Sequence, residues 1–146
     1  MLLVIVAASV IVAWGSDTTS DNSQIELPKP TGAGHYCRHY PKAALGSYAE
    51  GFVQLSFNIG TDGKVSNEAI ATSSGNPDLD QAAIKCASDF VYEPATLKGT
   101  PLVCPWMTIV SFCLDTQCHE RASQAGHQMS DAQKARPPCS LPDASK

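Results

Sequence analysis

The stretch that most limits how this chain can fold is GFVQLSFNIG, residues 51–60. Apolar side chains stand at every second position, with polar side chains between them. A β-strand directs successive side chains to opposite faces, so this period of two predicts a strand with one buried face. The apolar residues are Val53, Leu55, Phe57 and Ile59. Other segments must therefore cover that face.

The next residues predict a hairpin. Asp62-Gly63 is typical of a two-residue type I′ turn, in which both central residues have positive φ. We expect a return strand from Val65 to about Thr72. Its large apolar residues, Val65 and Ile70, stand five positions apart and so on opposite faces of a regular strand. The return strand should therefore carry a β-bulge or be weakly buried.

Residues 76–89 predict a helix. Asn76 is a good N-cap, Pro77 suits the first helical position, and the acidic Asp78 and Asp80 favour the positive end of the helix dipole. One apolar stripe follows at helical spacing, and the helix should end near Asp89. The stripe consists of Leu79, Ala82, Ala83, Cys86 and Phe90.

Three further segments complete the expected fold. A short amphipathic helix is expected from Tyr40 to about Tyr48, with Pro41 at its first position. Residues 91–101 should form a loop, and residues 102–114, rich in aromatic and branched side chains, a last strand. Pro105 cannot donate a ladder hydrogen bond, which places this strand at a sheet edge or gives it a bulge. The order α-β-β-α-β over residues 35–114 predicts an α+β fold, a three-stranded antiparallel sheet with two short helices.

The two flanks differ in composition. Residues 1–14 are apolar except for Ser9, and as a helix they would span about 21 Å, short of a bilayer core of roughly 30 Å. We expect residues 1–15 to be a signal peptide or a truncated membrane anchor, either of which places the domain outside the cytoplasm. Residues 16–34 are expected to be a linker. Residues 115–146, with Met129 and Leu141 as their only large aliphatic side chains, are expected to be a flexible tail that contains cysteines.

Composition excludes several classes of function. The net charge is −4 and no basic block occurs, so neither nucleic acid nor an anionic lipid surface is an expected partner. Asp78 and Asp80 could be taken for paired carboxylates, but two positions apart on a helix they do not face each other. The chain contains no phosphate-binding glycine loop. We expect neither an enzyme nor a cofactor.

The histidines and cysteines give little support for a metal or haem site. His35, Cys37 and His39 could offer zinc ligands, but a fourth ligand is not evident, and alternate positions of an extended segment point in opposite directions. Cys113 and Cys118-His119 form only a spaced-out version of a haem attachment motif. Six cysteines in so short a chain instead indicate disulfides in an oxidising compartment.

A series of short elements also follows one another along residues 40–114. They are Tyr40-Pro41 with Ala43 and Ala44, Gly51 opening GFVQLSFNIG, Asp62-Gly63 with Val65, Ser73-Ser74-Gly75, Leu79-Asp80 with Ala82-Ala83, Tyr92 with Pro94-Ala95, Gly99 with Pro101, and a closing strand through Phe112 and Leu114. In this order they resemble the C-terminal domain of the TonB energy-transducer family. The resemblance implies the same fold that the local patterns predict.

The resemblance implies a function by binding. Domains of this type are driven by a proton-powered motor in the inner membrane and engage an extended segment, the TonB box, of outer-membrane transporters. The segment adds as a strand beside the last strand, so main-chain hydrogen bonds carry the affinity. On this chain the docking edge would be residues 103–114, with the Tyr40-Pro41 corner as a second contact. The implied partner-binding residues are Tyr40, Pro41, Val103, Met107, Ile109, Ser111 and Phe112.

Departures from the family pattern leave a second hypothesis open. The Gln-Pro-x-Tyr-Pro corner reads Cys37-Arg38-His39-Tyr40-Pro41 here, the apolar segment contains Ser9 but no histidine, and the long proline-rich spacer is absent. The alternative to a working transducer is therefore a stand-alone periplasmic interaction module, stapled by disulfides and without a transport role.

The resemblance also implies a disulfide between Cys37 and Cys86, with free or otherwise paired thiols as the alternative. Such a bridge would stabilise the fold by roughly 4 kcal/mol in the chain-entropy view. Cys104 and Cys113 would lie about 30 Å apart along one strand at 3.3 Å per residue, too far to pair unless the strand breaks at Pro105. Their possible partners are Cys118 and Cys139. Either bridge would pin the tail across the edge that a partner strand needs.

Overall fold

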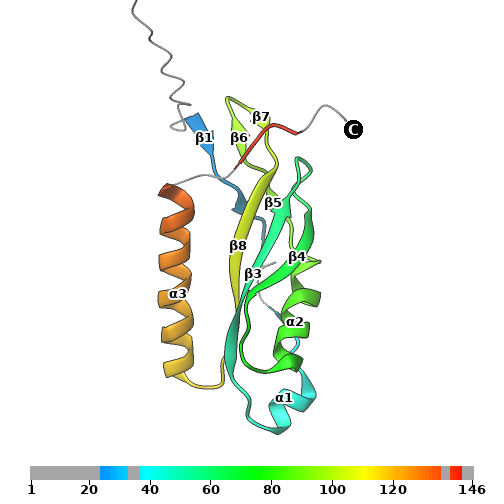
Figure 1. Cartoon of the computed structure of the whole chain (residues 1–146), viewed down its shortest axis with the longest axis vertical. Coiled ribbons are helices and arrows are strands. Elements are labelled where there is room, and N and C mark those ends of the chain that lie inside the picture. Colours follow the sequence, from blue (N-terminus) through cyan, green and yellow to red (C-terminus); the bar gives the residue numbers. More distant parts are fainter. Residues whose placement is uncertain (1–23, 33–36, 136–138, 143–146) are drawn as a thin grey trace, which may run out of the picture.

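A three-stranded antiparallel sheet forms the centre of the molecule. The computed structural model describes residues 24–32, 37–135 and 139–142. The sheet has the order β4-β3-β8, formed by β3 (Gly51–Ile59), β4 (Val65–Thr72) and β8 (Cys104–Phe112). Helix α2 (Pro77–Ala87) packs against β3 and β4 and contacts α1 (Lys42–Gly46), whereas α3 (Thr116–Ala135) lies beside β8 (Figure 1). The expected α+β fold is confirmed, with a third helix added to it.

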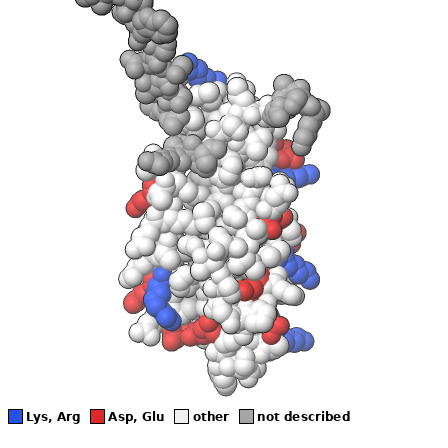
Figure 2. Space-filling model, in the orientation of Figure 1, with Lys and Arg blue, Asp and Glu red and all other residues white. Residues whose placement is uncertain are grey.

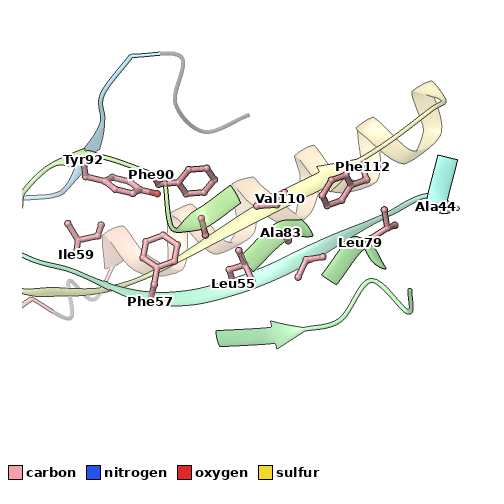
Figure 3. Packing of buried hydrophobic residues seen from close by; sticks show 12 residues of the cluster. Ala44, Leu55, Phe57, Ile59, Leu79, Ala83, Phe90, Tyr92, Val110 and Phe112 are labelled. Carbon is pink, nitrogen blue, oxygen red and sulfur yellow. The ribbon is translucent and has the colours of Figure 1, made fainter. Parts of the chain in front are cut away.

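Strand β3 holds the core together because its alternate side chains are all buried, as the period of two predicted. It pairs with β8 without any register shift, from Gly51 opposite Phe112 to Ile59 opposite Cys104. Figure 3 shows side chains of β3 meeting those of α2 and β8 in one cluster. The labelled members include Leu55, Phe57, Leu79, Ala83, Val110 and Phe112. Because this register is continuous, it also fixes which groups of β8 point away from β3.

The hairpin between β3 and β4 corrects one prediction. Gly63 has a φ of 77°, but Asp62 does not have positive φ, so the expected type I′ turn is wrong. The N–H of Gly60 donates to the carbonyl of Lys64, and that of Gly63 donates to the carbonyl of Gly60, which makes a three-residue loop. The physical reason lies outside the hairpin, since the Gly63 carbonyl accepts the N–H of Tyr92 at 2.9 Å.

Both alternatives for the return strand are observed. The β3–β4 register shifts twice, between Gln54 and Leu55 and between Ser56 and Asn58. Asn67 has a φ of 56°, and β4 contains no fully buried residue. Bulges twist an edge strand away from neighbours and so protect it from pairing with another chain. The outer edge of β4 is therefore a poor acceptor for a further strand.

Helix α2 starts as predicted. The Asn76 side chain accepts hydrogen bonds from the N–H groups of Asp78 and Leu79, and Pro77 is the first helical residue. Asp80 accepts three more hydrogen bonds, from the hydroxyl groups of Ser73 and Ser74 and from the N–H of Ser74. Burial alone would raise the pKa of this carboxyl, but these hydrogen bonds outweigh it and hold the pKa below its ordinary value. The carboxylate ties the loop after β4 to the helix.

Segments expected to be irregular form small strands. β1 (Ile25–Glu26) pairs with β6 (Thr96–Leu97), β6 pairs with β7 (Thr100–Pro101), and β2 (Lys29–Pro30) pairs with β5 (Tyr92–Glu93). The linker prediction is therefore wrong for these residues, because the partner strands supply the pairing that a lone polar segment lacks. The β6–β7 turn has positive φ at both Lys98 and Gly99, the geometry that had been expected at Asp62-Gly63. Residues 16–23, 33 and 34 lie outside the described residues.

The prediction of a flexible tail is wrong for residues 116–135, which form α3. Asp115 caps this helix, since its carboxylate accepts the N–H of Cys118 at 2.7 Å. Its buried side is made of small residues, Cys118 and Ala122, rather than of large aliphatic ones. A helix can lie against a strand on such a side because small side chains allow close approach.

All six cysteines form disulfides: Cys37–Cys86, Cys104–Cys139 and Cys113–Cys118. The first is the bridge that the resemblance implied, and it joins the start of the domain to α2. The other two join β8 and its following turn to the C-terminal segment. No helix among the described residues is long and apolar enough to cross a membrane. The signal or anchor expected at residues 1–15 lies outside the described residues.

Candidate partner-binding edge

Strand β8 is an edge strand, and its outward side is the site that the sequence predicted. Along a strand, residues alternate in directing their main-chain groups to one neighbour or the other. The N–H and C=O of Met107 point away from β3, since both bond to a side chain of α3. Ile109 and Ser111 share this direction by alternation, as does Val103 just before the strand.

A glutamine side chain occupies the middle of this edge. The Met107 N–H donates to Gln133 Oε1 at 2.7 Å, and Gln133 Nε2 donates to the Met107 carbonyl at 3.1 Å. One side-chain amide thus satisfies both main-chain groups of one residue. A residue of an added strand would offer the same donor and acceptor. Gln133 therefore takes the position of a partner's backbone.

Main chain from the C-terminal segment occupies the start of the edge. The N–H of Val103 donates to the Ser140 carbonyl at 2.8 Å, and the N–H of Ser140 donates to the Val103 carbonyl at 2.9 Å. The adjacent Cys104–Cys139 disulfide fixes this pairing covalently. We name residues 116–135 together with 139–142 the C-terminal cover.

The far end of β8 is closed by the turn into α3. The Glu50 carboxylate accepts the N–H groups of Leu114 and Asp115, the latter at 2.8 Å. The Cys113–Cys118 disulfide joins the end of the strand to the first turn of α3. Figure 1 shows the helix returning alongside β8 from this turn. Cover and strand are thus joined at both ends.

Between these contacts the cover does not fill all of the space beside β8. A groove of about 280 Å³ separates α3 from the strand and is lined by Ile109 of β8 together with Gly126, Met129 and Gln133 of α3. The outward main-chain groups of Ile109 and Ser111 have no hydrogen-bond partner among the described residues. Two strand residues are thus unpaired beneath the helix, although the edge around them is closed.

The predicted Tyr40-Pro41 corner is a packing feature. The Tyr40 hydroxyl donates to the carbonyl of Ala49, and its ring meets Phe112 edge-on at 5.5 Å between centroids. Burial, and to a smaller extent the nearby Glu50 carboxylate, raise the pKa of Tyr40. Pro41 precedes α1 as its N-cap residue, so that helix begins one residue later than predicted. Tyr40 joins the loop after α1 to the end of β8 and is half-buried there, and its contact with a partner stays a prediction.

The remaining predicted site residues divide by burial. Val103, Met107 and Ile109 are half-buried and Ser111 is exposed, whereas Phe112 is only 2% exposed and belongs to the core. Phe112 therefore cannot contact a partner through its side chain without the core opening. The structure brings Val103, Met107, Ile109 and Ser111 together along one edge, as predicted.

Trp106 was missed by the sequence analysis. It is half-buried and packs against the core cluster and against a second, smaller cluster formed by Ala95, Leu102 and Cys104. It also lines two grooves beside the edge. Pro28 and Pro30 of the N-terminal segment lie across one of these grooves from it. The signal available in the sequence was a large aromatic residue directly after the edge proline, Pro105.

Metal chemistry gains no site from the described part of the chain. The described residues contain no cluster of His, Cys, Asp and Glu that could hold a metal ion. Cys37 is bonded to Cys86 and therefore is not a thiolate ligand, and His35 lies outside the described residues. Cys113 and Cys118 bond to each other, so the haem interpretation is wrong. Charged residues of both signs are interspersed on the face shown in Figure 2, without a basic stripe.

Comparison with known protein families tests the resemblance seen in the sequence. Residues 37–114, just over half of the chain, match the family described as Gram-negative bacterial TonB protein C-terminal. The chain belongs to the TonB C-terminal family. A search of curated proteins gives no match. The matched range ends at Leu114, so the C-terminal cover lies entirely outside the family domain.

Membership gives the coarse function. Domains of the TonB C-terminal family are interaction domains of the bacterial envelope that act with outer-membrane transporters rather than as enzymes. The family domain in this chain contains both the core cluster and the β8 edge. What this chain adds to the TonB C-terminal domain is a helix that lies on that edge.

Proposed function

We propose that this TonB-type domain binds an extended segment of an outer-membrane transporter by adding it as a strand to the edge of β8. The observation that carries the proposal is the state of that edge. Val103, Met107, Ile109 and Ser111 direct main-chain groups outward, and where those groups are satisfied, the partner is an amide or a peptide backbone. The edge thus has the hydrogen-bonding pattern that strand addition requires.

Side chains beside the edge would then give selectivity. Alternate residues of an added strand point to the two faces of the sheet. Trp106 and Pro28 line a groove of about 510 Å³, and Trp106 and Met107 border another of about 450 Å³. Residues of α3 form part of each wall in the closed state, whereas Trp106, Pro28 and Met107 would remain if the cover left. Both grooves are mainly apolar. A transporter segment with apolar side chains at alternate positions would fit them. If a proton-driven motor in the inner membrane supplied energy to the domain, this binding would be part of energised uptake.

A second function is favoured by one specific observation, the C-terminal cover itself. Both ends of the cover are disulfide-bonded to β8 or its turn, which closes the edge in the state described. A stand-alone envelope module with a permanently closed edge would have this construction and no transport role. The two functions differ in whether a strand ever replaces the cover.

The proposal is tested through one main-chain group. Ile109→Pro removes the outward N–H of β8 without removing a ladder bond to β3, which is the arrangement in which proline is tolerated at a sheet edge. Ile109→Ala is the matched control, because it truncates the side chain but keeps the N–H. Both changes are made in the Cys104→Ala, Cys139→Ser background, where the cover is free to leave.

Binding of a set of synthetic periplasm-facing segments of outer-membrane transporters is measured by isothermal titration calorimetry. We expect the proline variant to bind at least about fivefold more weakly than the alanine variant, the effect of one hydrogen bond. Equal affinities of the two variants would rule out strand addition at Ile109. Circular dichroism of each variant verifies that the fold is retained.

A further inference from the structure

The C-terminal cover reproduces, within one chain, what a partner strand would do at β8. Gln133 satisfies Met107 in the manner of a backbone amide, and Ser140 pairs with Val103 as an antiparallel neighbour. These two contacts are four residues apart on β8 and lie on the same outward side. A helix that only filled space beside a sheet would have no need of either.

We propose that the C-terminal cover is an intramolecular occupant of the partner's strand position, and that the Cys104–Cys139 disulfide is the lock that keeps it there. The proposal rests on strand addition at β8 as the proposed function, and it adds the regulation of that site. With the lock closed the edge is unavailable. With the lock open, α3 swings on its first turn and uncovers the outward main-chain groups of Val103, Met107 and Ile109, in line with the already exposed Ser111.

The non-covalent hold on the far part of the cover is weak. Among the described residues no ion pair joins α3 to the rest of the domain, since Lys134 pairs with Asp131 of the same helix. Met129 faces the groove that separates α3 from Ile109 rather than a filled core. Beyond its first two turns, the cover is held by the bonds of Gln133 and Ser140, by the disulfide and by half-buried side chains such as Met129.

The two disulfides of the cover play different parts. Cys118 is buried and Cys113–Cys118 spans the turn between β8 and α3, so this bridge holds the base of the helix. Cys104–Cys139 lies at the opposite end, 35 residues apart in sequence, and holds the free end. Cutting the second bridge releases the end that carries Gln133 and Ser140 while the base remains attached.

Opening the lock needs a reductant, and a dithiol of the thiol–disulfide oxidoreductase class balances the reaction. Its thiolate attacks Cys139 Sγ, which is half-buried, whereas Cys104 is completely buried. The disulfide breaks, a mixed disulfide forms on Cys139, and Cys104 leaves as a thiolate that takes up a proton. The second thiol of the reductant then displaces Cys139 as a thiol. Two electrons reach the cysteine pair, and the dithiol becomes a disulfide.

The experiment separates the lock from the function by measuring both the edge and binding. Full-length wild type is compared with Cys104→Ala, Cys139→Ser, with the matched control Cys113→Ala, Cys118→Ala, and with Gln133→Ala, which alters the cover without touching a cysteine. Amide hydrogen exchange is measured at Met107 and Val103, with Leu55 in the core as the internal reference. Binding is measured with a synthetic nine-residue peptide of alternating Thr and Val with lysine ends, and with its N-methylated form, which cannot donate.

In the unlocked variant we expect exchange at Met107 and Val103 to be at least about tenfold faster than in wild type, the effect of losing two hydrogen bonds, with Leu55 unchanged. The same variant should bind the unmethylated peptide at least about tenfold more tightly than wild type. In Gln133→Ala the exchange rate at Met107 and the peptide affinity should both rise, but by less than in the unlocked variant. The control lacking Cys113–Cys118 should resemble wild type in both measurements.

The outcomes that overturn the proposal are distinct. Unchanged exchange at Met107 in the unlocked variant would overturn the lock whatever the binding result. Equal peptide affinity of wild type and the unlocked variant would leave strand addition standing and overturn the lock alone. Faster exchange without any peptide binding would overturn strand addition, and with it the assignment of the cover as an occupant.

Discussion

Removing the Cys37–Cys86 disulfide should cost this domain more stability than removing Cys113–Cys118. The first bridge joins cysteines 49 positions apart, and the chain-entropy relation gives about 4 kcal/mol for a loop of that length at 25 °C. The second joins cysteines 5 positions apart, for which the same relation gives about 2 kcal/mol. The double variant Cys37→Ala, Cys86→Ala should therefore lose roughly twice as much as Cys113→Ala, Cys118→Ala.

Urea unfolding followed by far-ultraviolet circular dichroism measures the difference. With a urea dependence of about 1–3 kcal/mol per molar, a loss of about 4 kcal/mol lowers the midpoint by roughly 1–4 M, and a loss of about 2 kcal/mol by half of that. Non-reducing peptide mass spectrometry verifies that the other two bridges stay intact in each variant. An equal or larger loss on removal of the short loop would refute the reasoning, because native-state packing rather than loop length would then set the stability.

Two further predictions concern single residues. Gly63→Ala should destabilise by roughly 3 kcal/mol or more, because a Cβ at its φ of 77° would lie 1.9 Å from the Tyr92 carbonyl oxygen. Gly99→Ala, with a φ of 82° and no atom within 4 Å, is the matched control and should cost about 1 kcal/mol in urea unfolding. Because the pKa of Asp80 is lowered in the folded state, its carboxylate contributes fully to the free energy of unfolding above the unfolded-state pKa of about 3.9. That contribution is lost as the pH falls through the folded-state pKa. Asp80→Asn should therefore flatten the fall in unfolding free energy below about pH 5, and an unchanged acid slope would contradict the role given to its three hydrogen bonds.

The parts of the fold that could be predicted from sequence are those with local causes. The alternation in β3 and the Asn76 cap each act within a few residues, and both formed where expected. The prediction of a type I′ turn was wrong because a distant residue, Tyr92, donates a hydrogen bond to the Gly63 carbonyl and favours a longer loop. The same long-range pairing turned the expected linker into strands, since Ile25 pairs with Leu97 and Lys29 pairs with Glu93, both far away in the sequence.

The candidate site shows the same division. The outward residues of β8 followed from the resemblance and from strand alternation, but what covers them did not. Helix α3 contains Met129 as its only large apolar residue, so its composition indicated a tail. Its signal was fainter, an N-cap at Asp115 followed by small and medium side chains at helical spacing, which are Cys118, Ala122, Ala125, Met129 and Gln133. The helix is stabilised by its contacts with a strand edge and by two disulfides. These contacts join distant residues, so no local sequence pattern predicts them.

Gly126 makes it possible to ask whether the C-terminal cover unfolds with the domain or separately. A glycine inside a helix costs about 1 kcal/mol relative to alanine, and a Cβ at this position would meet no atom within 4 Å. In the disulfide-bonded chain, Gly126→Ala should raise the urea midpoint by roughly 0.3–1 M, because a cover fixed at both ends unfolds together with the sheet. In the Cys104→Ala, Cys139→Ser background the same substitution should leave the midpoint unchanged, because the helix has already left β8 when the sheet unfolds. An equal gain in both backgrounds would mean that the cover remains packed without its lock, and that the edge of β8 is closed by the fold itself rather than by the disulfide.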